Sequence, residues 1–155
     1  MGGYIALRSM VVKDDIKAGV IWAGVVGSHE DLFNRWRRRG GVQPSPGVSI
    51  TPSTRGGRWR QLLEDQYGTP EENAKFWDSL SANSYLDDVS GPIQLHHGAE
   101  DESVPVEFSR KLEDQLLNIG KKVEYYEYPG DDHNISNNFN IAAQRSVDFF
   151  DRYLK

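Results

Sequence analysis

The sequence predicts an α/β protein with about three parallel strands and flanking helices. Apolar segments with little polar alternation, typical of strands covered on both faces, occur at residues 16–26, 93–97 and 122–128. Segments with apolar residues three or four positions apart, typical of helices, occur at residues 3–12, 105–119 and 138–154. Strands and helices that alternate in this way form right-handed crossovers, and therefore a parallel sheet.

The first strand, Ile16–Val26, is rich in valine, isoleucine and tryptophan, and Gly27 ends it. Residues 28–88 then form a loop-rich and helical excursion between two strands. Its first part, 28–60, is rich in arginine, proline and glycine, which predicts loop rather than core. Its second part is helical in character, and Thr69 followed by Pro70 and two glutamates is a typical helix start.

The last two predicted helices each place apolar side chains on one face. The members are Phe108, Leu112, Leu116 and Ile119 in the first, and Phe139, Ala143, Val147, Phe150 and Leu154 in the second. Gly120 is the stop signal of the first of these helices, and the strand at 122–128 follows it.

Composition limits the function classes. At 155 residues the chain suits one domain, and its mean hydropathy of −0.63 comes with no apolar stretch near the ~20 residues of a membrane span. No secretory signal is visible, so we expect a cytoplasmic protein without membrane contacts. The absence of cysteine removes disulfides, thiolate nucleophiles and cysteine-based zinc sites. A formal charge of −5 argues against nucleic-acid binding, which depends on phosphate neutralisation.

Two loops carry residues suited to catalysis, and each follows a predicted strand at the end where parallel α/β proteins place their sites. His97–Pro105 reads H-G-A-E-D-E-S-V-P and contains Asp101, while Tyr128–Asn134 reads Y-P-G-D-D-H-N and contains His133. A carboxylate can orient an imidazole through one ring nitrogen, while the other nitrogen takes a proton from a nucleophile. The unperturbed pKa of histidine lies near neutrality, which suits this role.

The two motifs, H-G-x-x-D-x-x-V-P and Y-P-G-x-x-H, resemble the catalytic end of the prolyl oligopeptidase-like branch of α/β-hydrolases, which includes dipeptidyl- and acylaminoacyl-peptidases and related esterases. The resemblance covers nearly the whole chain, because the start at Met1–Leu7 is similar to the turn that follows the nucleophilic serine in G-x-S-x-G. It implies an acid at Asp101, a base at His133 and an oxyanion-hole amide at Met1, without a metal or another cofactor. The substrate it implies is a peptide or a carboxylic ester.

No G-x-S-x-G pattern occurs in the sequence, so the nucleophile of this family is absent from these 155 residues. We therefore expect residues 1–155 to be the C-terminal portion of a hydrolase catalytic domain that begins just after the serine. Such a chain retains the acid and the base and is inactive or weakly active alone. The first strand would then have an exposed edge carrying Val20, Ile21, Trp22 and Val25, which predicts a homodimer or higher oligomer.

Other interpretations stay open at this stage. The chain is alternatively a non-catalytic oligomerising or interaction domain derived from a hydrolase. Asp101 alone suits a turn or the start of the following helix. His96 and His97 end a buried strand, where hydrogen-bonded histidines supporting the turn are the favoured interpretation. A metal-dependent hydrolase would draw its ligands from both loops and the preceding strand, namely His96, His97, Asp101, Asp131, Asp132 and His133.

Arginines alternate with tryptophans in the excursion. The members are Arg35, Trp36, Arg37, Arg38 and Arg39, then Arg58, Trp59 and Arg60. A solvated surface segment is the favoured interpretation, with recognition of a substrate carboxylate at the mouth of a pocket as the functional alternative.

Overall fold

The computed structural model describes residues 2–35 and 55–155, and its centre is a three-stranded parallel sheet in the order β1-β2-β3. The strands are β1 (Gly19–Trp22), β2 (Ile93–Gly98) and β3 (Val123–Tyr128). β1 pairs with β2 from Gly19 opposite Ile93, and β2 pairs with β3 as far as Gly98 opposite Tyr128. The predicted fold class is confirmed.

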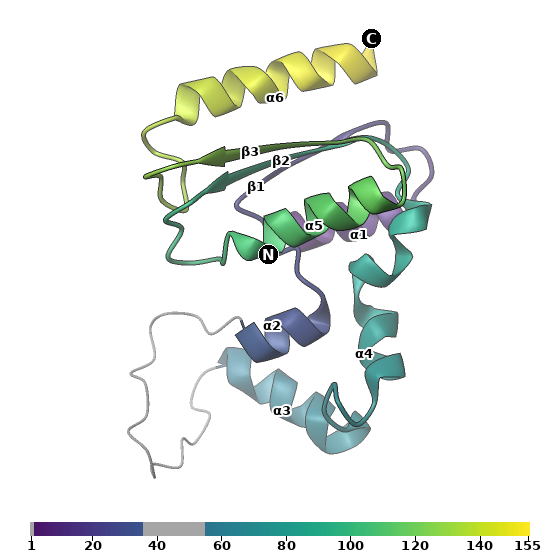
Figure 1. Ribbon diagram of the computed structural model, residues 1–155. Helices are drawn as coiled ribbons and strands as arrows, with labels where there is room; N and C mark the ends of the chain where they lie inside the picture. Colours follow the sequence, from purple (N-terminus) through teal and green to yellow (C-terminus); the bar gives the residue numbers. More distant parts are fainter. Residues whose placement is uncertain (1, 36–54) are drawn as a thin grey trace.

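Helices cover both faces of this sheet. They are α1 (Gly2–Val12), α2 (His29–Arg35), α3 (Arg55–Tyr67), α4 (Ala74–Leu80), the short 3₁₀ helix η1 (Ala82–Asp88), α5 (Glu107–Asn118) and α6 (Phe139–Leu154). Figure 1 shows α1 and α5 on one face of the sheet and α6 alone on the other, with α2, α3 and α4 grouped beyond the first face. None of these helices is long and apolar enough to cross a membrane, in the ranges that the structure describes.

The main core lies between the sheet and the face covered by α1 and α5. Leu95 at the centre of β2 and Leu112 on α5 are both completely buried there, together with Leu7 of α1. Every residue of β2 is buried, as expected for a central parallel strand covered by helices on both faces. A smaller cluster under α6 contains Tyr128, Ile135 and Ala142.

Helix α1 approaches the segment after β1 closely at a glycine. A methyl group added at Gly3 would lie 2.6 Å from the Cα atom of Gly24 and 2.9 Å from a methyl carbon of Ile21. Glycine at this position therefore allows the helix to pack directly against backbone.

The first strand is shorter than predicted. The extended segment was expected over Ile16–Val26, but β1 ends at Trp22 because Ala23 adopts a left-handed conformation with φ of 44°. The Ala23 amide still donates a hydrogen bond to the carbonyl of His96. Val25 consequently lies in the main core and not on the strand edge, which corrects the predicted edge.

The excursion also differs from prediction at two places. Helix α2 begins within the segment predicted as loop, and α4 begins at Ala74 instead of Thr69, because Asn73 caps it by accepting a hydrogen bond from the Phe76 amide. Thr69 and Glu72 bond reciprocally to each other's backbone amides across an isolated turn. The capping chemistry was recognised, but it stabilises a turn and not a helix.

The buried face of α6 was predicted incorrectly. The expected face included Phe139, Val147 and Leu154, and each of these side chains is more than half exposed. Ala142 and Phe149 are buried instead, one position away in the helical repeat. Ser146 on the same helix is partly buried, and its hydroxyl lies 3.2 Å from Nε2 of His96 on β2.

Trp36, Arg37, Arg38 and Arg39 lie outside the described residues, and the side chains of Arg35, Arg58, Trp59 and Arg60 are not described either. Met1, the predicted oxyanion-hole residue, also lies outside the described residues. The roles proposed for these positions therefore stay predictions.

Replacement of Gly3 by alanine tests the close approach of α1. We expect Gly3→Ala to lower the free energy of unfolding by about 1–3 kcal/mol, the usual cost of overpacking against backbone. Gly2→Ala is the matched control, because nothing lies within 4 Å of a methyl group added there. Urea denaturation measures both; equal stabilities of the two variants would contradict the assigned packing.

Candidate active site

The loops that follow β2 and β3 lie against each other through their backbones. The Ala99 amide donates to the carbonyl of Tyr128 at 2.9 Å, and the Glu100 amide donates to that of Asp131 at 3.0 Å. Gly98 permits this approach, since a side chain there would collide with the carbonyl oxygens of Asp131 and Asp132. The two loops are thus held together independently of their functional side chains.

Asp101 is the centre of the first loop, and its carboxylate is completely buried. One oxygen, Oδ1, accepts hydrogen bonds from the backbone amides of Ser103 at 2.7 Å and Val104 at 2.9 Å. The other, Oδ2, lies 2.7 Å from Nδ1 of His133 and 3.1 Å from Nε2 of His97. Four N–H groups therefore surround this carboxylate and hold it in one orientation.

His133 is bonded to the buried carboxylate through one ring nitrogen and is partly exposed. Its Nδ1 is bonded to Asp101, its side chain is 43% exposed, and Nε2 has no hydrogen-bond partner among the described residues. The structure thus brings together the carboxylate and the imidazole that the sequence placed on these two loops. An Nδ1–H donated to a carboxylate leaves Nε2 unprotonated in the neutral ring, and therefore able to accept a proton.

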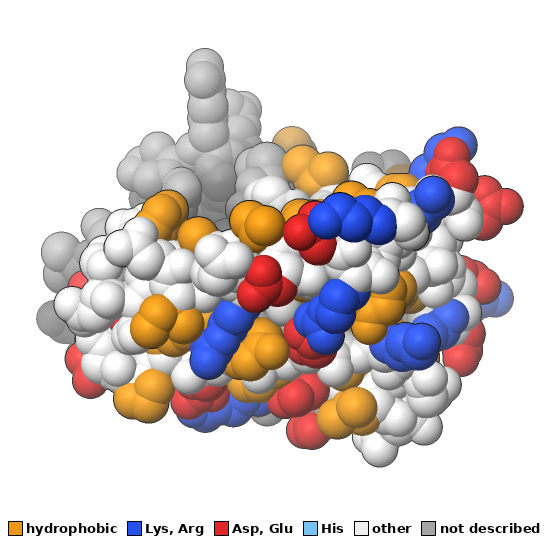
Figure 2. Space-filling view, turned by 90° about the horizontal axis from the view of Figure 1, so that it is seen from above, with side chains coloured by type: hydrophobic (Ala, Val, Ile, Leu, Met, Phe, Trp, Pro, Cys, Tyr) orange, Lys and Arg blue, Asp and Glu red, His pale blue; other side chains and the backbone are white. Residues whose placement is uncertain are grey.

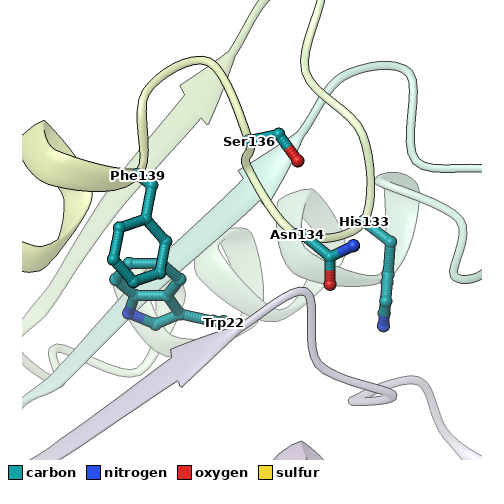
Figure 3. A pocket seen from close by; sticks show the side chains of 5 residues that line it. All are labelled: Trp22, His133, Asn134, Ser136 and Phe139. Atoms are coloured by element: carbon teal, nitrogen blue, oxygen red, sulfur yellow. The ribbon is translucent and has the colours of Figure 1, made fainter.

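An open pocket of about 530 Å³ lies beside this imidazole. Trp22 at the end of β1 and Phe139 at the start of α6 lie against each other on one side, with ring centroids 5.4 Å apart, and His133 and Asn134 lie on the other (Figure 3). The sequence analysis missed this pocket, because Trp22 reads as a core residue of the strand and Phe139 as part of a buried helical face.

The segment from Asp131 to Asn138 is shaped by its own carboxylates. Buried Asp131 accepts from the Asn137 amide at 2.7 Å and from the Asn138 side chain at 2.6 Å. Asp132 accepts from the amides of Asn134 and Ser136, and these hydrogen bonds, led by that from the Ser136 amide, lower its pKa. Asp131 and Asp132 therefore both stabilise the conformation of the loop that carries His133.

Ile135 anchors the same loop. It is completely buried in the small cluster under α6, although its φ of 54° is unusual for a β-branched residue. The cost of that conformation is offset by burial and by the hydrogen bonds of the neighbouring aspartates. His133, two residues earlier in the chain, therefore lies on a segment with little freedom to move.

His96 and His97 are both buried and hydrogen-bonded, as the favoured interpretation predicted. His97 is fully buried between Ser109 on α5, 2.7 Å from its Nδ1, and the carbonyl of Val104, 3.1 Å from its Nε2. Burial lowers its pKa. Its additional contact with Asp101 was not predicted.

His96 faces the opposite side of the sheet. Its Nε2 lies 2.7 Å from Oε1 of the Gln94 side chain, and its Nδ1 lies 2.8 Å from the Tyr128 hydroxyl. Arg145 donates a hydrogen bond to the same hydroxyl. Because an amide oxygen only accepts, the proton of His96 is on Nε2, and Tyr128 donates to Nδ1. Burial, reinforced by the nearby Arg145 charge, lowers the pKa of His96 to about 4.

The residues considered as metal ligands do not form one cluster. His96 lies on the α6 side of the sheet, and Asp131 and Asp132 bond to their own loop. Among the described residues, no group of three or more histidine or acidic side chains is arranged to hold a metal ion.

A parallel sheet with helices on both faces, and a polar site at the carboxyl ends of its strands, defines this chain as part of an α/β-hydrolase fold. The model of the prolyl oligopeptidase family matches residues 50–155. The chain therefore belongs to the prolyl oligopeptidase family.

One curated protein and several solved structures are similar to this chain. An uncharacterised peptidase of Bacillus subtilis, YuxL, is 32% identical over 76 residues, which are 49% of this chain and 11% of that protein. Pyrococcus horikoshii acylaminoacyl peptidase superimposes over 98% of this chain with a TM-score of 0.68 and 22% identity. Porphyromonas gingivalis dipeptidyl peptidase 4 does so over 98% with a TM-score of 0.65 and 19% identity.

The chain spans only a part of these relatives, namely 22% of the Pyrococcus enzyme and 18% of the Porphyromonas enzyme. At these identities the structural likeness establishes the fold. Activity and substrate need arguments from the site itself.

The low pKa of His96 predicts loss of stability in mild acid. In the unfolded chain the group titrates near 6.5 and in the folded protein near 4, so between these values the unfolded state binds more protons. Stability therefore falls as the pH drops from about 6.5 to about 4, by an amount on the order of 2–3 kcal/mol.

Urea denaturation at pH 7 and pH 5 measures this effect, and His96→Gln, which cannot titrate, is the control. The variant is less stable than the parent at pH 7, but its stability changes less between the two pH values. An identical pH dependence in the two proteins would contradict the assignment. Carboxylates with lowered pKa, such as Asp31 and Glu127, also contribute to stability, but that contribution is lost at a lower pH than the one from His96.

Proposed function

We propose that Asp101 and His133 are the acid and the general base of a serine-hydrolase site that acts on peptides or carboxylic esters. The observation that carries this proposal is the 2.7 Å hydrogen bond between Asp101 Oδ2 and His133 Nδ1, in a ring whose Nε2 is free among the described residues. Membership of a family of peptidases supports it.

In this proposal, Nε2 of His133 takes the proton of a serine hydroxyl as that oxygen attacks the substrate carbonyl. The imidazolium that results keeps its Nδ1–H directed at Asp101, whose negative charge stabilises it without accepting the proton. His133 then gives the proton from Nε2 to the leaving amine or alcohol. The burial of Asp101 strengthens this electrostatic support, because little water competes for its charge.

The nucleophile is not among these 155 residues, since no serine occurs in the pattern G-x-S-x-G. Ser136, which lines the pocket beside His133, donates its hydroxyl to the Asp132 carboxylate at 2.9 Å and is committed to the loop. We infer that the chain by itself is inactive or weakly active as a hydrolase. An oxyanion-hole amide at Met1 completes this proposal.

A peptide substrate fits both the pocket and the relatives. The rings of Trp22 and Phe139 provide an apolar surface beside the imidazole, where a side chain of the substrate can pack. The solved relatives include acylaminoacyl and dipeptidyl peptidases and a puromycin-hydrolysing peptidase of Mycobacterium tuberculosis. These names support cleavage of an amide bond; an ester passes through the same tetrahedral intermediate.

A fluorophosphonate probe and an activated ester together test this proposal. We expect no serine of the chain to be labelled by the probe, as read by mass spectrometry of the digested protein. We also expect slow hydrolysis of p-nitrophenyl acetate that depends on His133, because the imidazole can still act on water or on the ester. Asp101→Asn lowers this part of the rate by about tenfold, the effect of losing one charge-assisted hydrogen bond.

His133→Ala defines the background rate, and His96→Gln is the control for a histidine outside the site. Stoichiometric labelling of any serine would contradict the absence of a nucleophile. An ester rate that is the same in the parent and in His133→Ala would contradict the role of the base.

We further propose that the chain self-associates at the free edge of the sheet. Among the described residues β1 pairs only with β2, and Phe139 on α6, whose ring lies against Trp22 at the end of β1, is more than half exposed. Figure 2 shows hydrophobic and charged side chains interspersed over the α6 face of the molecule. Pairing of two β1 edges would bury the unpaired backbone groups together with these side chains.

Light scattering at micromolar concentration measures the assembly, and a dimer or higher oligomer is expected. Phe139→Ser shifts the population toward monomer, because it removes apolar surface next to β1. Leu154→Ser, at the far end of the same helix and similarly exposed, is the matched control and leaves the assembly unchanged. A monodisperse monomeric parent protein would overturn this proposal.

A further inference from the structure

His97 contributes to the site through a contact that the proposed mechanism does not use. Its Nε2 lies 3.1 Å from Asp101 Oδ2, the same oxygen that accepts from His133. Both side chains in this contact are completely buried. The acid is therefore in contact with two imidazoles, one buried and one exposed.

The neighbours of His97 determine which of its nitrogens carries the proton. The Val104 carbonyl, 3.1 Å from Nε2, can only accept, and so can the Asp101 carboxylate. Nε2 is therefore the protonated nitrogen, and its hydrogen is shared between these two oxygens. At the opposite side of the ring, Nδ1 is unprotonated and accepts from the Ser109 hydroxyl at 2.7 Å.

The ring is also neutral, since burial lowers the pKa of His97. His97 thus donates to the Asp101 oxygen that faces His133, and as a neutral group it adds no positive charge to the site. A lysine or arginine at this place would orient the carboxylate equally well, but its charge would offset that of Asp101. The carboxylate would then stabilise an imidazolium at His133 less effectively.

The same ring connects the acid to the scaffold. Val104 donates its amide to Asp101 Oδ1 and accepts from His97, while Ser109 belongs to α5, which packs on β2 and β3. The carboxylate is consequently held at Oδ1 by amides of the first loop and contacted at Oδ2 by His97, whose ring is bonded in turn to Ser109 of α5. A fixed acid restricts the orientations that the His133 ring can adopt.

We propose that His97 is a positioning residue for Asp101: its neutral Nε2–H tautomer, set by Val104 and Ser109, holds the carboxylate oxygen that orients His133. This inference rests on the proposed acid and base roles. It adds a third side chain to that pair, one that touches neither the substrate nor the nucleophile.

Nuclear magnetic resonance of the folded chain, labelled with ¹⁵N at histidine, tests the proposal without a requirement for hydrolase activity. The readout is the proton on Nδ1 of His133, which is observable when the hydrogen bond to Asp101 protects it from exchange with water. Two substitutions of His97 place a side-chain amide nitrogen differently. The amide nitrogen of glutamine can occupy the position of Nε2, whereas that of the shorter asparagine cannot.

We expect His97→Gln to retain the His133 Nδ1 proton signal, and His97→Asn to lose it or to exchange it about fivefold to tenfold faster, as for a weakened hydrogen bond. A merely structural role of His97 would affect both variants alike. Equal signals in the two folded variants would therefore overturn the proposal.

The parent protein gives a second measurement that needs no variant. The ¹⁵N shifts of His97 at pH 7 are expected to show a protonated Nε2 and an unprotonated Nδ1; the opposite tautomer or a doubly protonated ring would overturn the proposal. The same experiments distinguish the role of His97 from the roles of Asp101 and His133. Absence of the Nδ1 proton signal of His133 from the parent contradicts the proposed function, whereas its presence unchanged in His97→Asn contradicts the role of His97 alone.

Discussion

The parallel pairing of β2 with β3 is the constraint on which the site depends. Because the two strands run in register to Gly98 and Tyr128, the loops that follow them leave the sheet side by side. Two backbone hydrogen bonds then join the loops, and the absence of a side chain at Gly98 lets them meet. The distance between Asp101 and His133 is thus set by the sheet before either side chain contributes.

Buried polar groups on the two faces of the sheet have different consequences. On the α6 face, His96 bonds to Gln94 of its own strand and to Tyr128 of β3, which stabilises the fold at neutral pH and makes it sensitive to acid. On the α5 face, His97 is directed to Asp101 and therefore to the site. Two adjacent histidines on one strand serve two purposes because successive side chains of a strand point to opposite faces.

Much of the fold and the pair formed by Asp101 and His133 could be predicted from the sequence, since both depend on local patterns. Strand periodicity located β2 and β3, and the two loop motifs located Asp101 and His133. Features set by tertiary contacts could not be predicted. Trp22 lines an open pocket although it belongs to an apolar strand, and α6 buries Ala142 instead of Val147 because polar groups of β2 need partners on that helix. The contact of His97 with Asp101 depends on the turn between them, which sequence spacing does not specify.

Acylation of histidines by diethyl pyrocarbonate tests the central claim most directly, because this reagent attacks an unprotonated and accessible imidazole nitrogen. We expect His133 to react first, at Nε2, and Asp101→Asn to slow its reaction. His96 and His97, which are buried and hydrogen-bonded at both nitrogens, are expected to react about tenfold or more slowly, through local opening. Reaction of His133 at the rate of the buried histidines, or a rate unchanged in Asp101→Asn, would contradict the assignment of His133 as a base oriented by Asp101.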